Sequence, residues 1–323
     1  DLLPDCFRFV KGVVDSPDFS LNISREILQH DRQLKVIAAA IEKKIKAELV
    51  KMQKDDREKY EKFWKAFGTQ IKYGVVGEYG AKKDLLKDLL LFWSSKENGN
   101  TTLAAYKDRM PEDQPYYYYA CGESVDKIAK LPQVERILDK GYEILYCTED
   151  VDDFVMKALD EEKPELIQQV FQVDSGKKFK SVNDDDALPQ SDEEKKAAEE
   201  KAEAGKAVLD AVKEALGDEV KAVRASSILK SAACCLSAEG PVSLEMEKYM
   251  SKLEGGEKMK ADRVLELNLD SAPYAALKQA QEAGDTGKVA RYAKLLYGQA
   301  ELMAGLPLED PAEYARLVSE LMV

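Results

Sequence analysis

Hydrophobic positions in the first quarter of the chain change their spacing once. Residues 6–14 are apolar in runs or in alternation, which predicts a strand. Further on, apolar side chains recur every three or four residues, which predicts a long helix; they are Leu34, Ile37, Ile41, Ile45, Leu49 and Met52. A second stripe follows the polar segment KDDREK and consists of Tyr60, Phe63, Trp64, Phe67 and Ile71. Two stripes of similar length, joined in this way, predict an antiparallel helical pair with a buried seam.

The pattern then alternates between helical and strand periods. The predicted elements are, in order, helices at 83–93 and 101–110, a strand at 116–121, a helix at 124–139, a strand at 142–147 and a helix at 151–160. The strand, helix, strand, helix order is typical of a small parallel α/β unit. Pro132 is expected to kink or divide the helix that contains it.

Charge crowds together and hydrophobic residues thin out between residues 181 and 205, in SVNDDDALPQSDEEKKAAEEKAEAG. This composition predicts a solvated linker with a domain boundary near residue 190. The linker is expected to lead into a helix whose apolar stripe begins at Val208 and which ends at Gly217. Strands are predicted in EVKAVRASS and RVLELNLDS, with a helix at 242–253 between them.

Two helices at the carboxyl end have more apolar surface than one partner would cover. The final helix should begin at Asp310 as N-cap, followed by Pro311 at the first helical position and Glu313 at the capping-box position. We expect the two helices to form a four-helix dimer interface about a two-fold axis; the alternative is that both fold back on their own domain. The predicted interface residues are Tyr292, Leu295, Leu296, Leu302 and Met303 of the helix at 287–304, and Tyr314, Leu317, Val318 and Leu321 of the final helix.

Composition narrows the function classes. The 323 residues suffice for two domains, and 48 basic against 61 acidic side chains give a net charge of −13, which argues against nucleic acid as a partner. No apolar stretch reaches the roughly 20 residues of a membrane span, so we expect a soluble chain with no membrane partner. Five scattered cysteines and one histidine predict a reducing compartment and no metal site. Because the chain opens directly on DLLPDCFRFV, we expect its true start to lie upstream.

One arginine occupies an electrostatically unfavourable position. Ser24 is a good N-cap, so Arg25 falls in the first helical turn, beside the positive end of the helix dipole. Gln29 follows one turn later and projects from the same face. A guanidinium and an amide presented together suit an oxyanion or a phosphate. The alternative is an exposed arginine paired with a nearby acid.

A second candidate is the helix that carries Val242, Met246, Tyr249 and Met250. Methionine and aromatic side chains at helical spacing usually indicate core, but this helix follows the loop-like SAEGP, and methionine-rich surfaces suit recognition of varied apolar segments. A small α/β enzyme acting at GVVGEYG or ACGES is a further alternative. It would need a complete catalytic set, which the sequence does not show.

Five segments together resemble the heat-shock protein 90 chaperone family, and its bacterial members most closely. They are GVVDSPDFSLNISREILQ, YEKFWKAFGTQIKYGV, YYYYACGES, GYEILYCTEDVDDFVMKAL and LEDPAEYARLVSELM, in the family's order. The resemblance implies an α/β and α+β multidomain chain without the family's ATP-binding domain. Residues 1–188 would be the later part of the middle domain, with a catalytic-loop and helical segment at about 15–72 and a small α/β subdomain at about 73–188. Residues 189–323 would be a mixed α/β dimerisation domain.

The resemblance also implies site residues. Arg25, Gln29 and Asn22 would belong to a catalytic loop that acts on ATP, with Mg, held in the absent domain, so no activity is expected of this chain alone. Partly folded client proteins would be bound by Asp153, Phe154, Val242, Met246, Tyr249 and Met250.

Partners and location follow from the same resemblance. It implies a homodimer, admits a bacterial DnaK-type chaperone as a partner, and favours the bacterial cytoplasm because the tail SELMV lacks the eukaryotic recruitment motif. An organellar copy is the alternative origin. The rival function from another class is a non-enzymatic dimeric scaffold that docks fixed protein partners.

Overall fold

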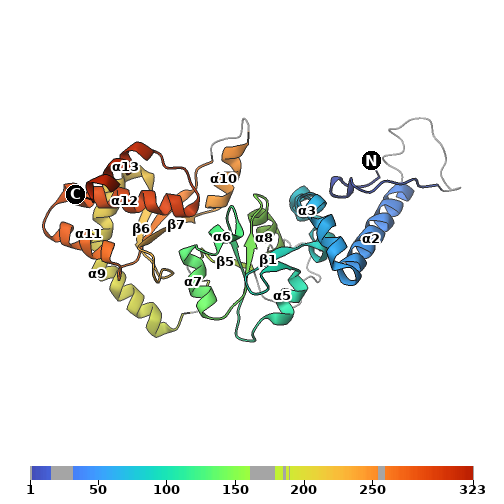
Figure 1. Cartoon of the computed structure of the whole chain (residues 1–323), viewed down its shortest axis with the longest axis horizontal. Coiled ribbons are helices and arrows are strands. Elements are labelled where there is room, and N and C mark those ends of the chain that lie inside the picture. Colours follow the sequence, from blue (N-terminus) through green and yellow to red (C-terminus); the bar gives the residue numbers. More distant parts are fainter. Residues whose placement is uncertain are drawn as a thin grey trace. The chain divides into compact units, whose positions relative to one another are not determined.

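A computed structural model describes residues 2–15, 32–160, 179–184, 187–188, 190–253 and 259–322 (Figure 1). The chain forms two compact units. The first comprises Asp1–Trp93, Gly99–Arg109 and Phe154–Val170, and the second comprises Ser94–Asn98, Met110–Asp153 and Phe171–Val323. The assignment of 1–188 and 189–323 to two domains stays a prediction.

The predicted helical pair is present in the first unit. Helix α2 spans Arg32–Asp55 and α3 spans Arg57–Gly80, and the two pack on each other. Asp56 alone separates them, and its side chain caps α3 by accepting a hydrogen bond from the Lys59 amide at 3.1 Å. Tyr60 is fully buried, and its hydroxyl donates to the Leu89 carbonyl. Tyr60 therefore contributes apolar burial to α3, and its hydroxyl joins this helix to the turn at Lys87–Leu89.

The predicted strand at 6–14 is wrong. The segment contains a short 3-10 helix, η1, at Asp5–Phe7. The Phe9 ring lies 5.1 Å from that of Phe63 and 4.9 Å from that of Phe67, so its aromatic side chain packs on α3. Val13 is 94% exposed. Phe7 is buried and Phe9 packs on α3, whereas Val13 faces water, so this segment has a strand-like pattern of apolar residues without forming a strand.

The predicted helix at 83–93 is right only in its first half. Helix α4 spans Lys83–Leu86 and a 3-10 turn, η2, spans Lys87–Leu89, after which the chain extends into strand β1 at Phe92–Ser94. Leu89, Leu90, Leu91 and Phe92 are all buried. A run of residues that is buried on every side is compatible with a helix or with a strand. Periodicity alone could therefore not place the end of the helix. Strand β2 at Gly99–Thr101 and helix α5 at Leu103–Arg109 follow.

The predicted parallel α/β unit is confirmed. Strand β3 at Tyr117–Cys121 pairs in parallel with β4 at Ile144–Cys147 and with β5 at Phe179–Ser181. The sheet has the order β2-β1-β4-β3-β5. Pro132 divides the helix between β3 and β4, as expected, and the helices are α6 at Val125–Ile128, α7 at Pro132–Asp139 and, after β4, α8 at Asp152–Asp160.

The predicted linker is partly wrong, because its charged half is helical. Helix α9 spans Asp192–Leu216, so it begins well before the apolar stripe at Val208. Ser191 and Glu194 form a reciprocal capping box, and three acids occupy the first turn. Alanine, glutamate and lysine are strong helix formers, so capping and propensity extend the helix beyond its buried part. Gly217 ends it at a φ of +54°, as predicted, and the 3-10 turn η4 spans Gly217–Glu219.

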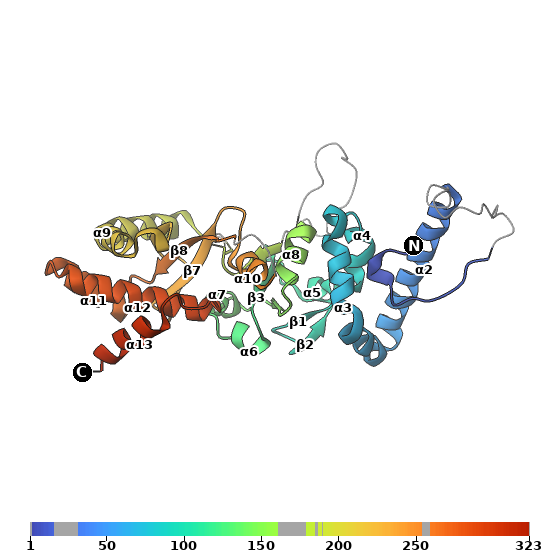
Figure 2. The ribbon, with the colours of Figure 1, turned by 90° about the horizontal axis from the view of Figure 1, so that it is seen from above.

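A three-stranded sheet forms the centre of the carboxyl-terminal part. Its order is β6-β8-β7, with β6 parallel and β7 antiparallel to β8. The strands are β6 at Ala222–Ala225, β7 at Cys234–Glu239 and β8 at Asp262–Leu267, and the helices are α10 at Leu244–Lys252, α11 at Ala272–Glu282, α12 at Thr286–Ala304 and α13 at Pro311–Glu320. Helix α9 packs on β6 and α12 packs on β7 and on α9, which closes one apolar core (Figure 2). No helix within the described ranges has the length and apolar character needed to cross a membrane.

Candidate functional site

Helix α10 presents three different faces, set by its periodicity. Leu244 and Glu247 point toward the carboxyl-terminal core, where Leu244 is buried. Glu245, Lys248 and Lys252 follow at i, i+3 and i+7 and share a second face. The third face is apolar, and its members at i, i+3, i+4 and i+7 are Met246, Tyr249, Met250 and Leu253.

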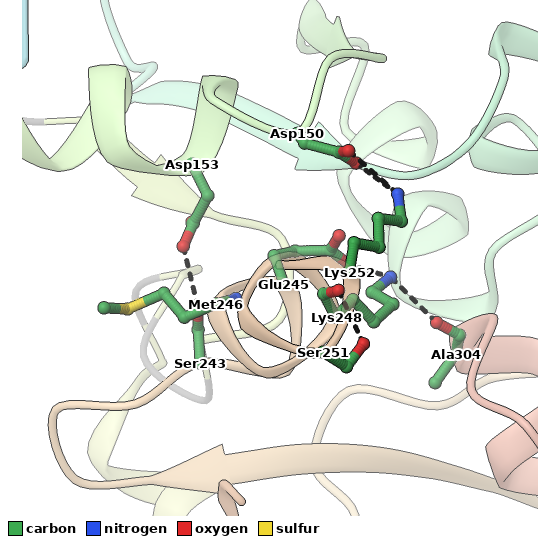
Figure 3. A network of polar contacts seen from close by, with 9 residues as sticks. All are labelled: Asp150, Asp153, Ser243, Glu245, Met246, Lys248, Ser251, Lys252 and Ala304. Carbon is green, nitrogen blue, oxygen red and sulfur yellow. Dashed lines mark hydrogen bonds and ion pairs between the residues drawn. The ribbon is translucent and has the colours of Figure 1, made fainter. Parts of the chain in front are cut away.

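The helix begins at a hydrogen-bonded pair (Figure 3). The Ser243 hydroxyl is the N-cap and accepts from the Met246 amide at 3.2 Å. It donates to Oδ2 of Asp153 at 2.7 Å, while Oδ1 of Asp153 accepts from the Tyr119 hydroxyl at 3.5 Å. Asp153 lies in the first turn of α8 and is buried. One carboxylate therefore joins the start of α10 to β3 and α8.

The charged face of α10 is also held by the protein. Lys252 Nζ lies 2.7 and 2.9 Å from the two carboxylate oxygens of Asp150. Lys248 pairs with Glu245 and donates to the Ala304 carbonyl at 3.0 Å, at the end of α12. Figure 3 shows these lysines on a different side of the helix from Met246. The polar side chains thus attach α10 to its surroundings.

Burial controls the protonation of Glu245. Desolvation raises the pKa of this carboxyl above 4.5, and the nearby Asp153 and Asp150 raise it further. Lys248 acts in the opposite direction without reversing the shift. The charged form of Glu245 is therefore less favourable here than in water.

A buried ionic cluster connects α10 with α12 through strand β8. Arg263 donates to Glu247 at 2.6 Å, to the Tyr297 hydroxyl at 2.7 Å and to Glu301 at 2.9 Å. Burial raises the pKa of Tyr297 to about 12, so its hydroxyl stays protonated. Because each charge is paired within the core, the cluster fixes α10 relative to α12.

A cavity of about 180 Å³ lies beside the charged face of α10. Glu245, Lys248 and Lys252 line it from the helix, and Cys121 and Cys147 line it from the ends of β3 and β4. Among the residues that the structure covers, no group of three or more histidine, cysteine, aspartate or glutamate side chains is arranged to hold a metal ion.

Comparison with known proteins decides the family. The model of the family described as "Hsp90 protein" matches residues 1–323. The chain belongs to the Hsp90 family. It is 52% identical over 322 residues to the "Chaperone protein HtpG" of Clostridium perfringens and 50% identical over 323 residues to that of Bacillus subtilis (strain 168). Each match covers 100% of this chain and 49% or 50% of the relative, so the chain spans about half the length of the curated relatives it matches. The resemblance read from the sequence is thereby confirmed.

The predicted client-contact residues of this Hsp90 chain fall into two groups. Asp153 is only 6% exposed and acts as the anchor of Ser243. Val242 is partly buried against the carboxyl-terminal core. The remaining predicted residues, Phe154, Met246, Tyr249 and Met250, are half-buried. Their contact with clients stays a prediction, with the apolar face of α10 as its structural basis.

The other predicted sites differ in how far the Hsp90 structure describes them. Arg25, Gln29 and Asn22 lie outside the described residues. Of the predicted dimer-interface residues, Leu296 and Leu317 are buried within the subunit, while Leu302 is 51% and Leu321 is 59% exposed. The half-buried members are Tyr292, Leu295, Met303, Tyr314 and Val318.

Sequence reasoning missed the groups that position α10 in this Hsp90 chain. Ser243 precedes the helix as an N-cap, a signal that the sequence does contain. Arg263 stands inside an apolar strand, where a charged residue indicates a buried partner, but the sequence does not say which acids supply it. Glu247 and Glu301 come from distant segments, so only the fold brings them to Arg263.

Proposed function

We propose that this chain is the client-binding and dimerising part of an ATP-dependent Hsp90 chaperone. The proposal is supported by family membership over residues 1–323 and by an amphipathic helix with a methionine-rich face. A matching relative is named a chaperone protein, and the chain is 52% identical to the 49% of that protein that it matches.

The arrangement of α10 carries the client-binding part of the proposal. In an ordinary surface helix the apolar face packs inward and the charged face meets water. Here Glu247, Lys248 and Lys252 make the attachments, and the stripe of Met246, Tyr249 and Met250 is half-buried. Methionine side chains adapt to partners of different shape because they are unbranched and polarisable. A half-buried stripe of this kind suits transient binding of varied apolar segments.

Suppression of aggregation by the isolated chain tests client binding. Met250→Asp places a charge on the apolar face and should abolish protection of a heat-unfolded client. Ser251→Asp adds the same charge one position later, on an exposed residue of another face, and should leave protection intact. Equal protection by wild type and both variants would contradict client binding by this face, and no protection by wild type would favour the rival function, a dimeric scaffold that docks fixed partners.

Dimerisation is proposed for the two carboxyl-terminal helices. Leu302 of α12 and Leu321, which follows α13, are more than half exposed although both are large and apolar. Met322 is 79% exposed as well. Burial of apolar surface stabilises association by about 25 cal/mol per Å², so a second copy that covers these side chains would gain from doing so.

The catalytic part of the proposal concerns the whole protein. ATP would be bound with Mg in another domain. Arg25, with Gln29 and Asn22, would stabilise the negative charge that develops on its phosphate during hydrolysis. Arg25→Ala in the full-length protein should lower ATP turnover by about a hundredfold or more while ATP affinity changes little. Normal turnover by that variant would remove this role. A DnaK-type partner and the bacterial cytoplasm complete the proposal.

A further inference from the structure

Two cysteines far apart in the sequence are direct neighbours in the sheet. Cys121 ends β3 and Cys147 ends β4, and they are register partners in the parallel pairing of these strands. Adjacent strands lie about 4.8 Å apart, which falls within the Cα separation of about 4.4–6.8 Å that a disulfide requires. Register partners also project from the same face of a sheet.

The surroundings of Cys121 and Cys147 also place the two thiols close together. Both thiols line the cavity of about 180 Å³ beside α10. Cys147 is buried, Cys121 is half-buried, and its neighbour Cys147 raises the pKa of the Cys121 thiol. A small neutral oxidant that enters the cavity therefore meets Cys121 with a second thiol at the paired position of the neighbouring strand.

We propose that Cys121 and Cys147 form a redox-sensitive dithiol that hydrogen peroxide converts into a disulfide across β3 and β4. In the first step the sulfur of Cys121 attacks one peroxide oxygen, the O–O bond breaks, and a sulfenic acid and one water form. In the second step the sulfur of Cys147 attacks the sulfur of Cys121, the S–O bond breaks, and a second water leaves. Two thiols lose two electrons in total, and the peroxide gains them.

Oxidation of Cys121 by peroxide should be slow because little of this cysteine is present as thiolate. The hydrogen bond with Cys147 and burial raise the pKa of Cys121 well above 9.0. The thiolate is the attacking form, so the pair should resist brief exposure and respond to sustained oxidation. The disulfide needs little backbone movement, because the two strands are already paired at this position.

The remaining cysteines provide an internal control. Cys234 and Cys235 are adjacent in β7, so their side chains point to opposite faces of the sheet. Both are buried, and the Cys234 thiol donates to the Leu296 carbonyl at 3.2 Å. If nearness in the sequence decided which cysteines are joined, Cys234 and Cys235 would form the disulfide. If the fold decides, Cys121 and Cys147 form it.

Mapping of disulfides after oxidation tests the proposal. The folded chain is incubated with hydrogen peroxide, the remaining thiols are alkylated, and the digest is analysed by mass spectrometry without reductant. We expect a linked peptide that contains Cys121 and Cys147, lighter by two hydrogen atoms than its separate halves and lost on reduction. Cys234 and Cys235 should be recovered alkylated.

A variant identifies the attacking thiol. In Cys147→Ser the sulfenic acid on Cys121 has no partner, so dimedone should label it. No Cys121–Cys147 peptide from the folded wild type, under conditions in which a urea-unfolded sample forms disulfides, would overturn the proposal. Equal yields of this peptide and of peptides that join other cysteines would also overturn it, because they would show oxidation without selection by the fold. Both of these outcomes are measured on the wild-type chain, so they do not require that Cys147→Ser folds.

Discussion

The Ser243 hydroxyl donates a 2.7 Å hydrogen bond to the buried carboxylate of Asp153, and the same oxygen caps helix α10. This contact attaches the helix at its first residue. The cluster around Arg263 attaches it again at Glu247, one turn later. Two polar attachments on the inner side of α10 hold the methionine-rich stripe in a fixed direction.

Removal of the Ser243 hydroxyl should destabilise the chain. Ser243→Ala loses the N-cap and leaves the buried Asp153 with one fewer donor, so we expect a loss of about 1–2 kcal/mol in the free energy of unfolding. Urea denaturation measures it. Ser251→Ala, whose exposed hydroxyl bonds only to the Lys248 carbonyl in the described structure, should change stability by less than about 0.5 kcal/mol. Equal effects of the two substitutions would contradict the anchoring role.

Arg263 should contribute far more to the free energy of unfolding than an exposed arginine on the same sheet does. Its ion pair with Glu301 joins side chains that are 8% and 5% exposed. Arg263→Met leaves the buried Glu301 and the half-buried Glu247 without their cation, so we expect a loss of about 3–5 kcal/mol. Arg224→Met removes the half-exposed pair with Glu239 and should cost at most about 1 kcal/mol. Thermal or urea unfolding of both variants distinguishes these outcomes, and similar losses would exclude a special role for the cluster.

The stability of the chain should depend on pH through Glu245. Its pKa is raised in the folded state, so its contribution is fully present below 4.5 and is lost as the pH rises through the raised value. Glu245→Gln has no such loss, so its stability relative to wild type should increase from pH 4 toward neutrality. Urea unfolding at several pH values measures the difference.

Glu239 provides the control of opposite sign. Its hydrogen bonds with Arg224 and Lys221 lower its pKa, so its contribution is present above 4.5 and is lost as the pH falls. Glu239→Gln should therefore become slightly less stable relative to wild type as the pH rises. A difference of the same sign for Glu245→Gln and Glu239→Gln would contradict the assignment of the two shifts.

Charge on the exposed leucines at the carboxyl end should separate the subunits. Leu302→Asp and Leu321→Asp place carboxylates on side chains that are 51% and 59% exposed, so folding of the subunit should be little affected. Sedimentation velocity should show a dimer for wild type and a shift of at least tenfold in the dimer dissociation constant for each variant. Leu138→Asp, at a leucine of α7 that is 39% exposed, should remain dimeric. A wild-type chain that sediments as a monomer at high concentration would contradict the proposed interface.

Much of the fold follows from the sequence because helices are visible in periodicity. The helices α2, α3, α12 and α13 bury regular stripes, and the Asp310 cap is present as predicted, accepting from the Glu313 amide at 2.9 Å. Short strands are harder to predict. Residues 89–92 are buried on all sides, and β7 lacks a clear alternation, so tertiary packing decides their state.

The candidate site was predictable only in part. Met246, Tyr249 and Met250 were found because they repeat at helical spacing. The partners that orient the helix come from α8, β8 and α12, and no local pattern links Asp153, Arg263 or Glu301 to it. The Cys121–Cys147 pairing likewise depends on strand register, which the sequence leaves open.

Site-specific photocrosslinking tests the central claim, that the apolar face of α10 contacts unfolded proteins, most directly. A photoreactive side chain in place of Met250 should form covalent adducts with an unfolded, fluorescently labelled client, and an excess of unlabelled client should compete. The same group in place of the exposed Leu138 should give adducts at background level. Equal labelling from both positions, or none from position 250 while the chain still suppresses aggregation, would contradict the claim.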